Sequence, residues 1–356
     1  MPISGLDELS GEIGWLMKFG LFGGATARRE DTADSQGYHR FVDYVIEAED
    51  LGFYSTFLVE HHFTGIGQVS ASLQLLSYLA ARTSTIRLGT AVTTLPWHNP
   101  VLLAEQVATI DLLSNGRLDF GIGKGYRDIE FKGFCLDRSE ADERYRESIA
   151  FMTKAWTTDH RFSHHGKYWS FEDVIIEPPC MQKPHPPIWS GAGTPESIGR
   201  AVADGFNVLL DQFATMELTT KRVAAFRDAC VACGRTWDPM DLGLTRALYI
   251  TKTAAERDAA LDLRTERASR TYKFGLLSGL PEQPQSFADQ RMTEEDAVLI
   301  GTVDDVAAKI ETLRDMGVEY VLFTVTESIE TLRAFSKEIM PAFAADAVPE
   351  RKAAAS

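Results

Sequence analysis

The sequence is poor in positive charge, in cysteine and in long apolar runs, and each shortage excludes a class of protein. Lysine and arginine number 36 against 51 aspartate and glutamate residues, a formal net charge of −15. Such an acidic surface repels nucleic acid and anionic membranes, so we expect neither as a partner. No run reaches the ~18 apolar residues that a membrane-spanning helix needs. With four cysteines and no visible secretory signal, the chain is expected in the reducing cytoplasm.

The sequence also lacks a recognisable metal site. Cys230 and Cys233 form a CxxC pair at the end of a helical pattern, without a second pair to complete a zinc site, so ordinary helix packing is favoured. The first predicted strand ends in residues 22–24, Phe-Gly-Gly, with no His-x-His and no carboxylate. His164 and His165 fall in a long loop and are expected to face solvent. We therefore expect no bound metal.

What the chain does contain is a repeated local pattern of amphipathic run, glycine and short apolar run. The pattern occurs around Gly52, Gly205 and Gly317. A glycine in this place is typical of the left-handed residue just past a helix end. The apolar runs that follow are rich in β-branched and aromatic residues and are predicted to be buried strands. One helix is predicted over 302–316, with Thr302 and Asp305 as a cap pair. Helices that alternate with strands indicate a parallel sheet.

Eight strands are predicted, and eight strands alternating with helices favour a closed (β/α)8 TIM barrel. An open, doubly wound sheet is the alternative, which periodicity alone does not exclude. The predicted strands cover 17–22, 54–59, 86–92, 117–123, 186–191, 207–211, 242–250 and 320–325.

The barrel is expected to be one domain over 17–342, with an N-terminal extension over 1–16 and a tail over 343–356. Two connections, 159–185 and 273–301, are longer than the barrel needs, so we predict insertion loops at the C-terminal face of the strands. The second loop is either a mobile lid or a passive disordered segment.

Active sites of TIM barrels lie at the C-terminal ends of the strands, so the residues there are the ones to examine. The fifth predicted strand runs into a turn of small residues before a helix, which Thr194 can cap and Pro195 can begin. Its backbone N–H groups and the helix dipole favour a bound phosphate. The fourth strand ends in a glycine-rich turn with one cation. The predicted cofactor-binding residues of the two turns are Gly123, Lys124, Gly125, Tyr126, Ser190, Gly191, Ala192, Gly193, Thr194 and Ser197.

His61, which follows the second strand, is the predicted proton-transfer residue. An imidazole titrates near working pH and can donate or accept a proton. Adjacent side chains on an extended segment point in opposite directions, so His61 and His62 are not expected to enter the barrel end together. A histidine held by local hydrogen bonds is the alternative.

Several motifs occur together and in one order along the chain. They are MKFG from Met17, EHHF at 60–63, LGTAVTTLPWHNP at 88–100, SNGRLDFGIGKGY at 114–126, SGAGTPES at 190–197 and GTVDDVAAKI at 301–310. From Met17 almost to Pro341 the chain therefore resembles bacterial luciferase and the luciferase-like flavin-dependent monooxygenases.

The resemblance implies roles for individual residues. His61 corresponds to the family's active-site histidine, which assists formation of a flavin hydroperoxide. A non-prolyl cis peptide that supports the flavin ring maps to Ala91 and Val92. The phosphate-binding cation maps to Lys124 and the hydroxyl of the phosphate turn to Ser197. The reactive cysteine of luciferase is replaced by glycine (Gly123), which argues against light emission rather than against oxygenation.

The resemblance further implies an enzyme that uses reduced FMN and O2 to oxygenate a small organic substrate. A separate flavin reductase would supply the reduced FMN, because the chain has no dinucleotide fingerprint. The substrate is expected near Trp97, Tyr126 and the 273–301 loop, and a homodimer is expected. Two alternatives stay open: a deazaflavin-dependent dehydrogenase on the same barrel, and a non-catalytic flavin-binding subunit.

Overall fold

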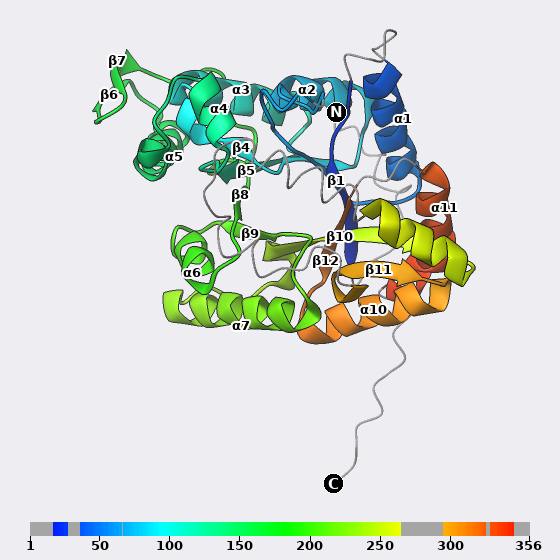
Figure 1. Cartoon of the computed structure of the whole chain (residues 1–356). Coiled ribbons are helices and arrows are strands. Elements are labelled where there is room, and N and C mark those ends of the chain that lie inside the picture. The colour runs from blue at the N-terminus through cyan, green and yellow to red at the C-terminus, as the bar shows by residue number, and fades with distance from the viewer. Residues whose placement is uncertain (1–16, 28–35, 66, 265–294, 325–327, 345–356) are drawn as a thin grey trace, which may run out of the picture.

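The protein is a closed barrel of eight parallel strands with helices on the outside (Figure 1). The computed structural model describes residues 17–27, 36–65, 67–264, 295–324 and 328–344. The barrel strands are β1 (Lys18–Gly23), β2 (Ser55–Leu58), β3 (Arg87–Thr90), β5 (Leu118–Gly123), β8 (Ile188–Gly191), β9 (Asn207–Leu210), β10 (Leu242–Ile250) and β12 (Tyr320–Thr324). Each strand pairs in parallel with the next, and β12 pairs with β1 to close the ring. The predicted TIM barrel is confirmed, and the open sheet is excluded.

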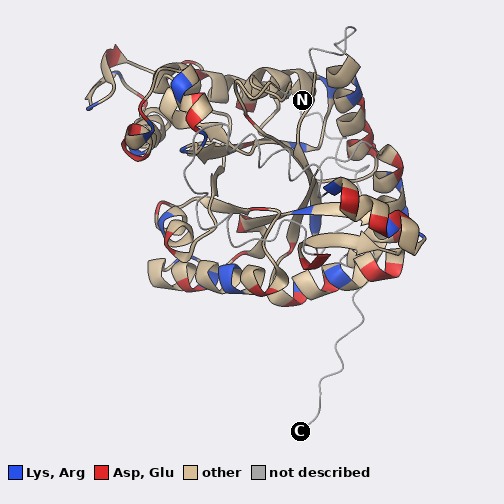
Figure 2. Ribbon diagram, viewed as in Figure 1, with Lys and Arg blue, Asp and Glu red and all other residues tan. Residues whose placement is uncertain are grey.

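Helices follow the strands and cover the barrel, and acidic and basic residues are distributed along these helices (Figure 2). They are α1 (Gln36–Asp50), α2 (Ser72–Arg82), α3 (Pro100–Leu113), α4 (Asp128–Gly133), α5 (Ala141–Thr157), α6 (Pro195–Ala203), α7 (Met216–Cys233), α10 (Val303–Met316) and α11 (Ile329–Glu338). The reciprocal cap between Thr302 and Asp305 forms as predicted at the start of α10. Gly52, Gly205 and Gly317 have φ angles of +87°, +79° and +96°, so they end helices in the predicted left-handed conformation.

Large apolar side chains fill the barrel interior, so the barrel is a packed core. The interior cluster consists of Phe57, Trp189, Leu209, Tyr320 and Leu322, each at most 6% exposed. The Phe57 ring requires a residue without a side chain on the neighbouring strand, because a Cβ at Gly89 would lie 2.4 Å from it. The chemistry is therefore confined to the strand ends and the loops beyond them.

The third predicted strand is interrupted. Its hydrogen bonding as β3 stops at Thr90, and the peptide bond between Ala91 and Val92 is cis, as the resemblance implied. The chain then resumes as β4 (Thr93–Thr94), which pairs with β5. The prediction of one continuous strand over 86–92 was wrong, because the strand hydrogen bonding of β3 ends at Thr90 and resumes only at Thr93.

The connection over 159–185 is a folded insertion. It forms the antiparallel hairpin of β6 (Phe162–His165) and β7 (Ser170–Val174), which projects from the ring beyond α5 (Figure 1). The expectation that both histidines face solvent holds for His165 but was wrong for His164. The His164 Nε2 atom lies 3.4 Å from a carboxylate oxygen of Glu147 on α5, and 21% of the side chain is exposed.

The connection over 273–301 is only partly described. Its last residues form β11 (Val298–Gly301), which extends the sheet beside the end of β10. A loop over the whole range was therefore the wrong expectation, because residues 298–301 are buried and paired. Residues 273–294, which carry the expected lid, lie outside the described residues. At the C-terminus the core includes Phe343, which is 1% exposed, one residue beyond the expected end of the barrel domain.

Candidate active site

His61 lies beyond the end of β2, and the short helix α4 holds its ring. The His61 Nδ1 atom lies 3.2 Å from Oε1 of Glu130, and the backbone N–H of His62 donates to the same oxygen at 3.0 Å. Glu130 is 2% exposed, whereas 18% of the His61 side chain is exposed. Burial lowers the pKa of His61; the hydrogen bond to Glu130 opposes this shift, and the charge of Arg127 adds to it. A neutral imidazole at neutral pH follows.

His62 points away from His61 and belongs to a separate cluster around Glu60. The buried Glu60 carboxylate accepts a hydrogen bond from Trp97 Nε1 at 2.9 Å and lies 3.0 Å from His98 Nε2 and 3.3 Å from His62 Nε2. Burial alone would raise the pKa of Glu60, but the hydrogen bonds of His62, His98 and Trp97 outweigh burial and lower it to about 2. The adjacent histidines therefore have separate carboxylate partners, and the ionised Glu60 ties the end of β2 to the segment after β4.

The cis segment meets the ends of two further strands. A Cβ at Gly123, at the end of β5, would lie 2.4 Å from Cγ2 of Val92, and one at Gly191, at the end of β8, would lie 3.7 Å from Cγ1. The contact at 2.4 Å requires a residue without a side chain at Gly123, whereas the contact at 3.7 Å would be ordinary packing, and the ends of both strands lie against Val92. The structure thus brings together Val92, Gly123 and Gly191, three of the residues predicted to bind the cofactor.

The turn after β8 forms the predicted cap of α6, and it uses Ser197. The Ser197 hydroxyl accepts the N–H groups of Gly193 and Thr194 at 3.2 and 3.0 Å, while Thr194 Oγ1 accepts the N–H of Ser197. Two backbone donors therefore converge on one oxygen in an exposed turn. This arrangement fits a phosphate oxygen that would join or displace the hydroxyl.

Lys124 and Ser190, from the two glycine-rich turns, both contact the first turns of α5. The exposed Lys124 Nζ lies 3.6 Å from Asp142 Oδ1. Ser190 hydrogen-bonds to Tyr145, whose pKa is raised by burial. Asp142 and Tyr145 are three residues apart and share one face of the helix. The two predicted phosphate elements therefore flank the same helix start.

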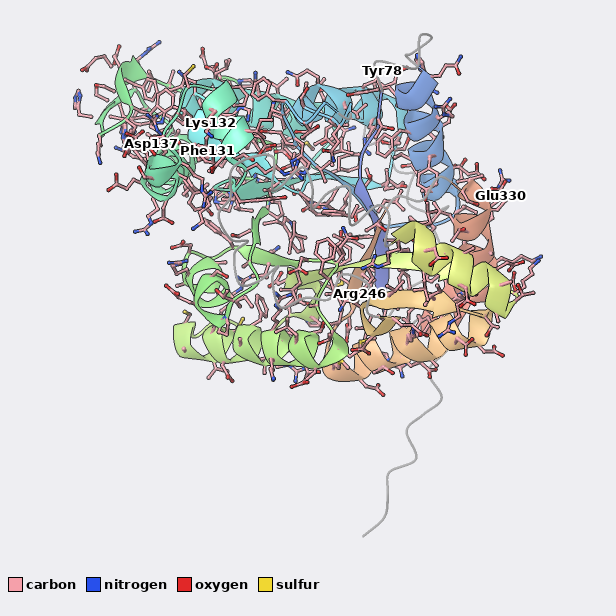
Figure 3. All side chains as sticks on the ribbon, in the orientation of Figure 1. Tyr78, Phe131, Lys132, Asp137, Arg246 and Glu330 are labelled. Atoms are coloured by element: carbon pink, nitrogen blue, oxygen red, sulfur yellow. The ribbon has the colours of Figure 1, made fainter. Side chains whose placement is uncertain are left out.

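Trp97 and Tyr126, predicted to line the substrate site, have different surroundings. Trp97 is packed in an aromatic cluster, with its ring centroid 5.5 Å from that of Phe131 and 5.1 Å from that of Phe134. Phe131 lies on α4, which carries Glu130 (Figure 3). Tyr126 is 39% exposed, and its ring lies 5.5 Å from the guanidinium of Arg127. Of the two, Tyr126 has the surface to meet a ligand.

Sequence reasoning missed the groups that hold these loops. Glu130 is one of two acidic residues in the six-residue helix α4, and no spacing connects it to His61. Arg222 on α7 is 2% exposed and bonds Gly193 O at 2.8 Å and Asp211 Oδ2 at 2.9 Å, so it fastens the turn after β8 to the end of β9. Arg246 on β10 (Figure 3) is fully buried and donates hydrogen bonds to Asp211 O and Ala214 O in the segment after β9. These are long-range contacts that no local pattern encodes.

Neither a metal cluster nor a membrane span is found within the described ranges. No group of three or more histidine, cysteine, aspartate or glutamate side chains is placed there to hold a metal ion. None of the helices there has the length and apolar character to cross a bilayer. Cys230 is buried within α7 and Cys233 is exposed at its end.

Comparison with known proteins identifies the family. Residues 17–320 match the family described as luciferase-like monooxygenase, so the chain belongs to that family of oxidoreductases. It is 26% identical to the oxygenase component of flavin-dependent trigonelline monooxygenase from Acinetobacter baylyi, over 96% of this chain and 99% of that relative. The FMNH2-dependent dimethylsulfone monooxygenase of Pseudomonas putida is 28% identical, over 76% of this chain and 77% of the relative.

Solved structures agree, and the relatives extend beyond monooxygenases. The monooxygenase RslO1 from Streptomyces bottropensis superposes with a TM-score of 0.81 at 27% identity, covering 92% of this chain and 100% of that one. An F420-dependent glucose-6-phosphate dehydrogenase from Amycolatopsis mediterranei is 28% identical over 87% of this chain and 96% of its own length. The family therefore includes both oxygen-dependent and F420-dependent enzymes.

Proposed function

We propose that this protein is the oxygenase component of a two-component flavin-dependent monooxygenase. The observation that carries the proposal is His61, a partly exposed imidazole held by a buried carboxylate at the strand ends of a luciferase-like barrel. When bound, reduced FMN would supply two electrons and activate O2. One oxygen atom would enter a small organic substrate and the other would leave as water, with FMN returned in its oxidised form.

The residues of the chain divide the remaining work. Lys124 and the turn over 190–197 hold the phosphate, and Ala91 and Val92 support the ring system. Their exposed backbone and converging N–H donors fit such a group. His61 holds or moves a proton at Nε2. Loops around the strand ends limit the access of water, which protects a reactive bound species from decay.

Tyr126 is the proposed wall of the substrate site, and Trp97 is proposed to lie near the same substrate, because its ring would be 3.2 Å from a Cβ at the neighbouring Gly125. The identity of the substrate is left to a screen. A separate reductase is proposed as the source of reduced FMN; the name of the trigonelline relative, an oxygenase component, supports this.

A homodimer in the cytoplasm completes the proposal. Large apolar side chains are exposed on α2 and α3, namely Tyr78, Leu102, Leu112 and Leu113, at 40 to 59%. Exposed apolar side chains on two neighbouring helices are typical of a surface that binds another subunit. All four cysteines are free thiols, which is consistent with a reducing compartment.

The test is an anaerobic titration with reduced FMN, followed by an oxygen pulse in a stopped-flow spectrophotometer. Saturable binding and a delay before the spectrum of oxidised flavin returns would support the monooxygenase. Immediate reoxidation at the rate of free flavin, or no binding, would contradict it.

A second function is kept because F420-dependent dehydrogenases are among the relatives. F420 is a deazaflavin that transfers hydride without oxygen. The same titration with F420 in place of FMN, under nitrogen and with candidate alcohols or sugar phosphates, separates the two. Cofactor binding with no turnover in either assay would instead favour a non-catalytic binding subunit.

A further inference from the structure

Two buried carboxylates at the strand ends hold two adjacent histidines in different ways. Glu60 meets His62 together with Trp97 and His98, whereas the carboxylate of Glu130 meets, among the described residues, the ring of His61 and the backbone N–H of His62. The His62 ring therefore packs in the aromatic cluster around Trp97. His61 has a single side-chain partner within the described part of the chain, which leaves its other ring nitrogen available.

We propose that Glu130 is a positioning residue that fixes the tautomer of His61, so that Nε2 is the nitrogen that exchanges the proton. Oε1 of Glu130 already accepts the backbone N–H of His62, so this oxygen acts as an acceptor and the Nδ1 atom that faces it carries the hydrogen. Nε2 then presents a lone pair. The role of this tautomer in catalysis rests on the proposed function, but the tautomer itself does not depend on which cofactor binds.

The backbone N–H of His62 makes the arrangement rigid. It donates to the same Oε1 at 3.0 Å, so this oxygen receives two donors from neighbouring residues. Glu130 is 2% exposed and lies on α4, directly before Phe131, which is 1% exposed. The Glu130 side chain is thus fixed by α4 at its backbone and by two donors at Oε1, and it gives the His61 imidazole one orientation. In Glu130→Gln, the same two N–H donors would orient the amide so that its carbonyl oxygen faces His61.

The first experiment reads the tautomer directly. The protein is labelled with 15N-histidine, and two-bond 1H–15N spectra are recorded for wild type, Glu130→Gln and Glu130→Ala, with His61→Gln to assign the signal. We expect wild type and Glu130→Gln to carry the hydrogen on Nδ1. Glu130→Ala should shift His61 toward the Nε2–H form that a free imidazole prefers. An Nε2–H form in wild type, or an unchanged tautomer in Glu130→Ala, would overturn the proposal.

The matched control is Glu217→Gln, which removes one negative charge from an exposed residue of α7 that is 79% exposed and pairs with Lys221. Its His61 signal should be identical to that of wild type. If the control shifts the tautomer as Glu130→Ala does, net charge rather than the contact is responsible, and the proposal fails. Because the wild-type spectrum is itself decisive, a variant that does not fold leaves the proposal open to refutation.

The second experiment connects the tautomer to the reaction. In the oxygen pulse with reduced FMN, Glu130→Ala should slow the step that depends on His61 by roughly 10- to 100-fold, below the ~100- to 10,000-fold cost of losing proton transfer entirely. Glu130→Gln should slow the same step less than Glu130→Ala does. Equal losses in both variants would refute a role through the tautomer.

The pH profile adds a readout that a merely structural role would not move. The charged groups that influence His61 are Glu130, Glu60 and Arg127. The hydrogen bond and the negative charge of Glu130 both raise the pKa of His61. Glu130→Ala loses both and Glu130→Gln loses the charge, so the acid limb of the profile should move to lower pH in both variants, and further in Glu130→Ala. If wild type does not react with reduced FMN and oxygen at all, the proposed function fails while the spectra still decide the role of Glu130.

Discussion

Replacing Glu60 with glutamine tests how strongly the buried carboxylate stabilises the end of the barrel. Glutamine keeps the shape and one acceptor oxygen but resembles the protonated acid, so the substitution removes the charge that Trp97, His62 and His98 surround. Glu60 is 4% exposed, so solvent screens these contacts little. The folded structure lowers the pKa of Glu60 from 4.5 to about 2.

The magnitude follows from that shift. A difference of 2.5 pKa units corresponds to about 3 kcal/mol of stability at pH 7. Because the folded-state pKa is the lower one, the contribution is complete above pH 4.5 and is lost as the pH falls toward 2. At pH 3 about 1.5 kcal/mol should remain. With an unfolding entropy of about 2.1 cal/mol/K per residue over 356 residues, Glu60→Gln should lower Tm by about 4 °C at neutral pH.

The assay is thermal unfolding of wild type and Glu60→Gln at pH 7, 4 and 3, by calorimetry or circular dichroism. The exposed Glu217→Gln is the control and should change Tm by less than about 1 °C. The reasoning is refuted if Glu60→Gln unfolds within 1 °C of wild type at pH 7. A difference between the two proteins that stays constant down to pH 3 would refute it equally, because the charge would then not be its source.

Four further predictions concern the site and the assembly. His61→Ala should slow the reaction of bound reduced FMN with oxygen about 100-fold while its Kd stays within about threefold, as titration and stopped-flow kinetics can show; an unchanged rate would remove His61 from the mechanism. Since burial lowers the pKa of His61, the acid limb of the wild-type pH–rate profile should lie below 6.5, and a limb above that value would contradict a neutral imidazole. Lys124→Ala should weaken FMN binding about tenfold and leave the binding of riboflavin, which has no phosphate, unaffected; equal losses of affinity for both flavins would contradict a phosphate contact. Leu113→Asp should convert the proposed dimer to a monomer in light scattering, and an intact dimer would contradict the proposed interface.

The sequence was informative wherever a local rule operates. Helix ends at Gly52, Gly205 and Gly317 and the cap between Thr302 and Asp305 depend on neighbouring residues, and all of them form as predicted. Strand order in a (β/α)8 barrel follows from the alternation of elements, so the placement of His61 at the same end as the β5 and β8 turns followed as well.

Predictions failed where pairing with a distant segment decides the structure. Residues 298–301 have too few positions to show a period, and they become β11 because the end of β10 offers free backbone groups. His164 is partly buried because Glu147, 17 residues earlier on α5, accepts backbone N–H groups of the hairpin and so holds it close. The break between β3 and β4 lies at residues 91–92, and no composition signal marks it.

The sequence by itself therefore determined the barrel, the family and the identity of the histidine and the turns at the strand ends. Only the tertiary structure decided what each histidine contacts. His61 and Glu130 are 69 positions apart and meet because α4 folds back over the end of β2. Glu60 meets His98 because adjacent parallel strands end at the same edge of the barrel. Periodicity and local propensity report only near neighbours along the chain, whereas the protonation state of a catalytic group is set by charges and burial in three dimensions.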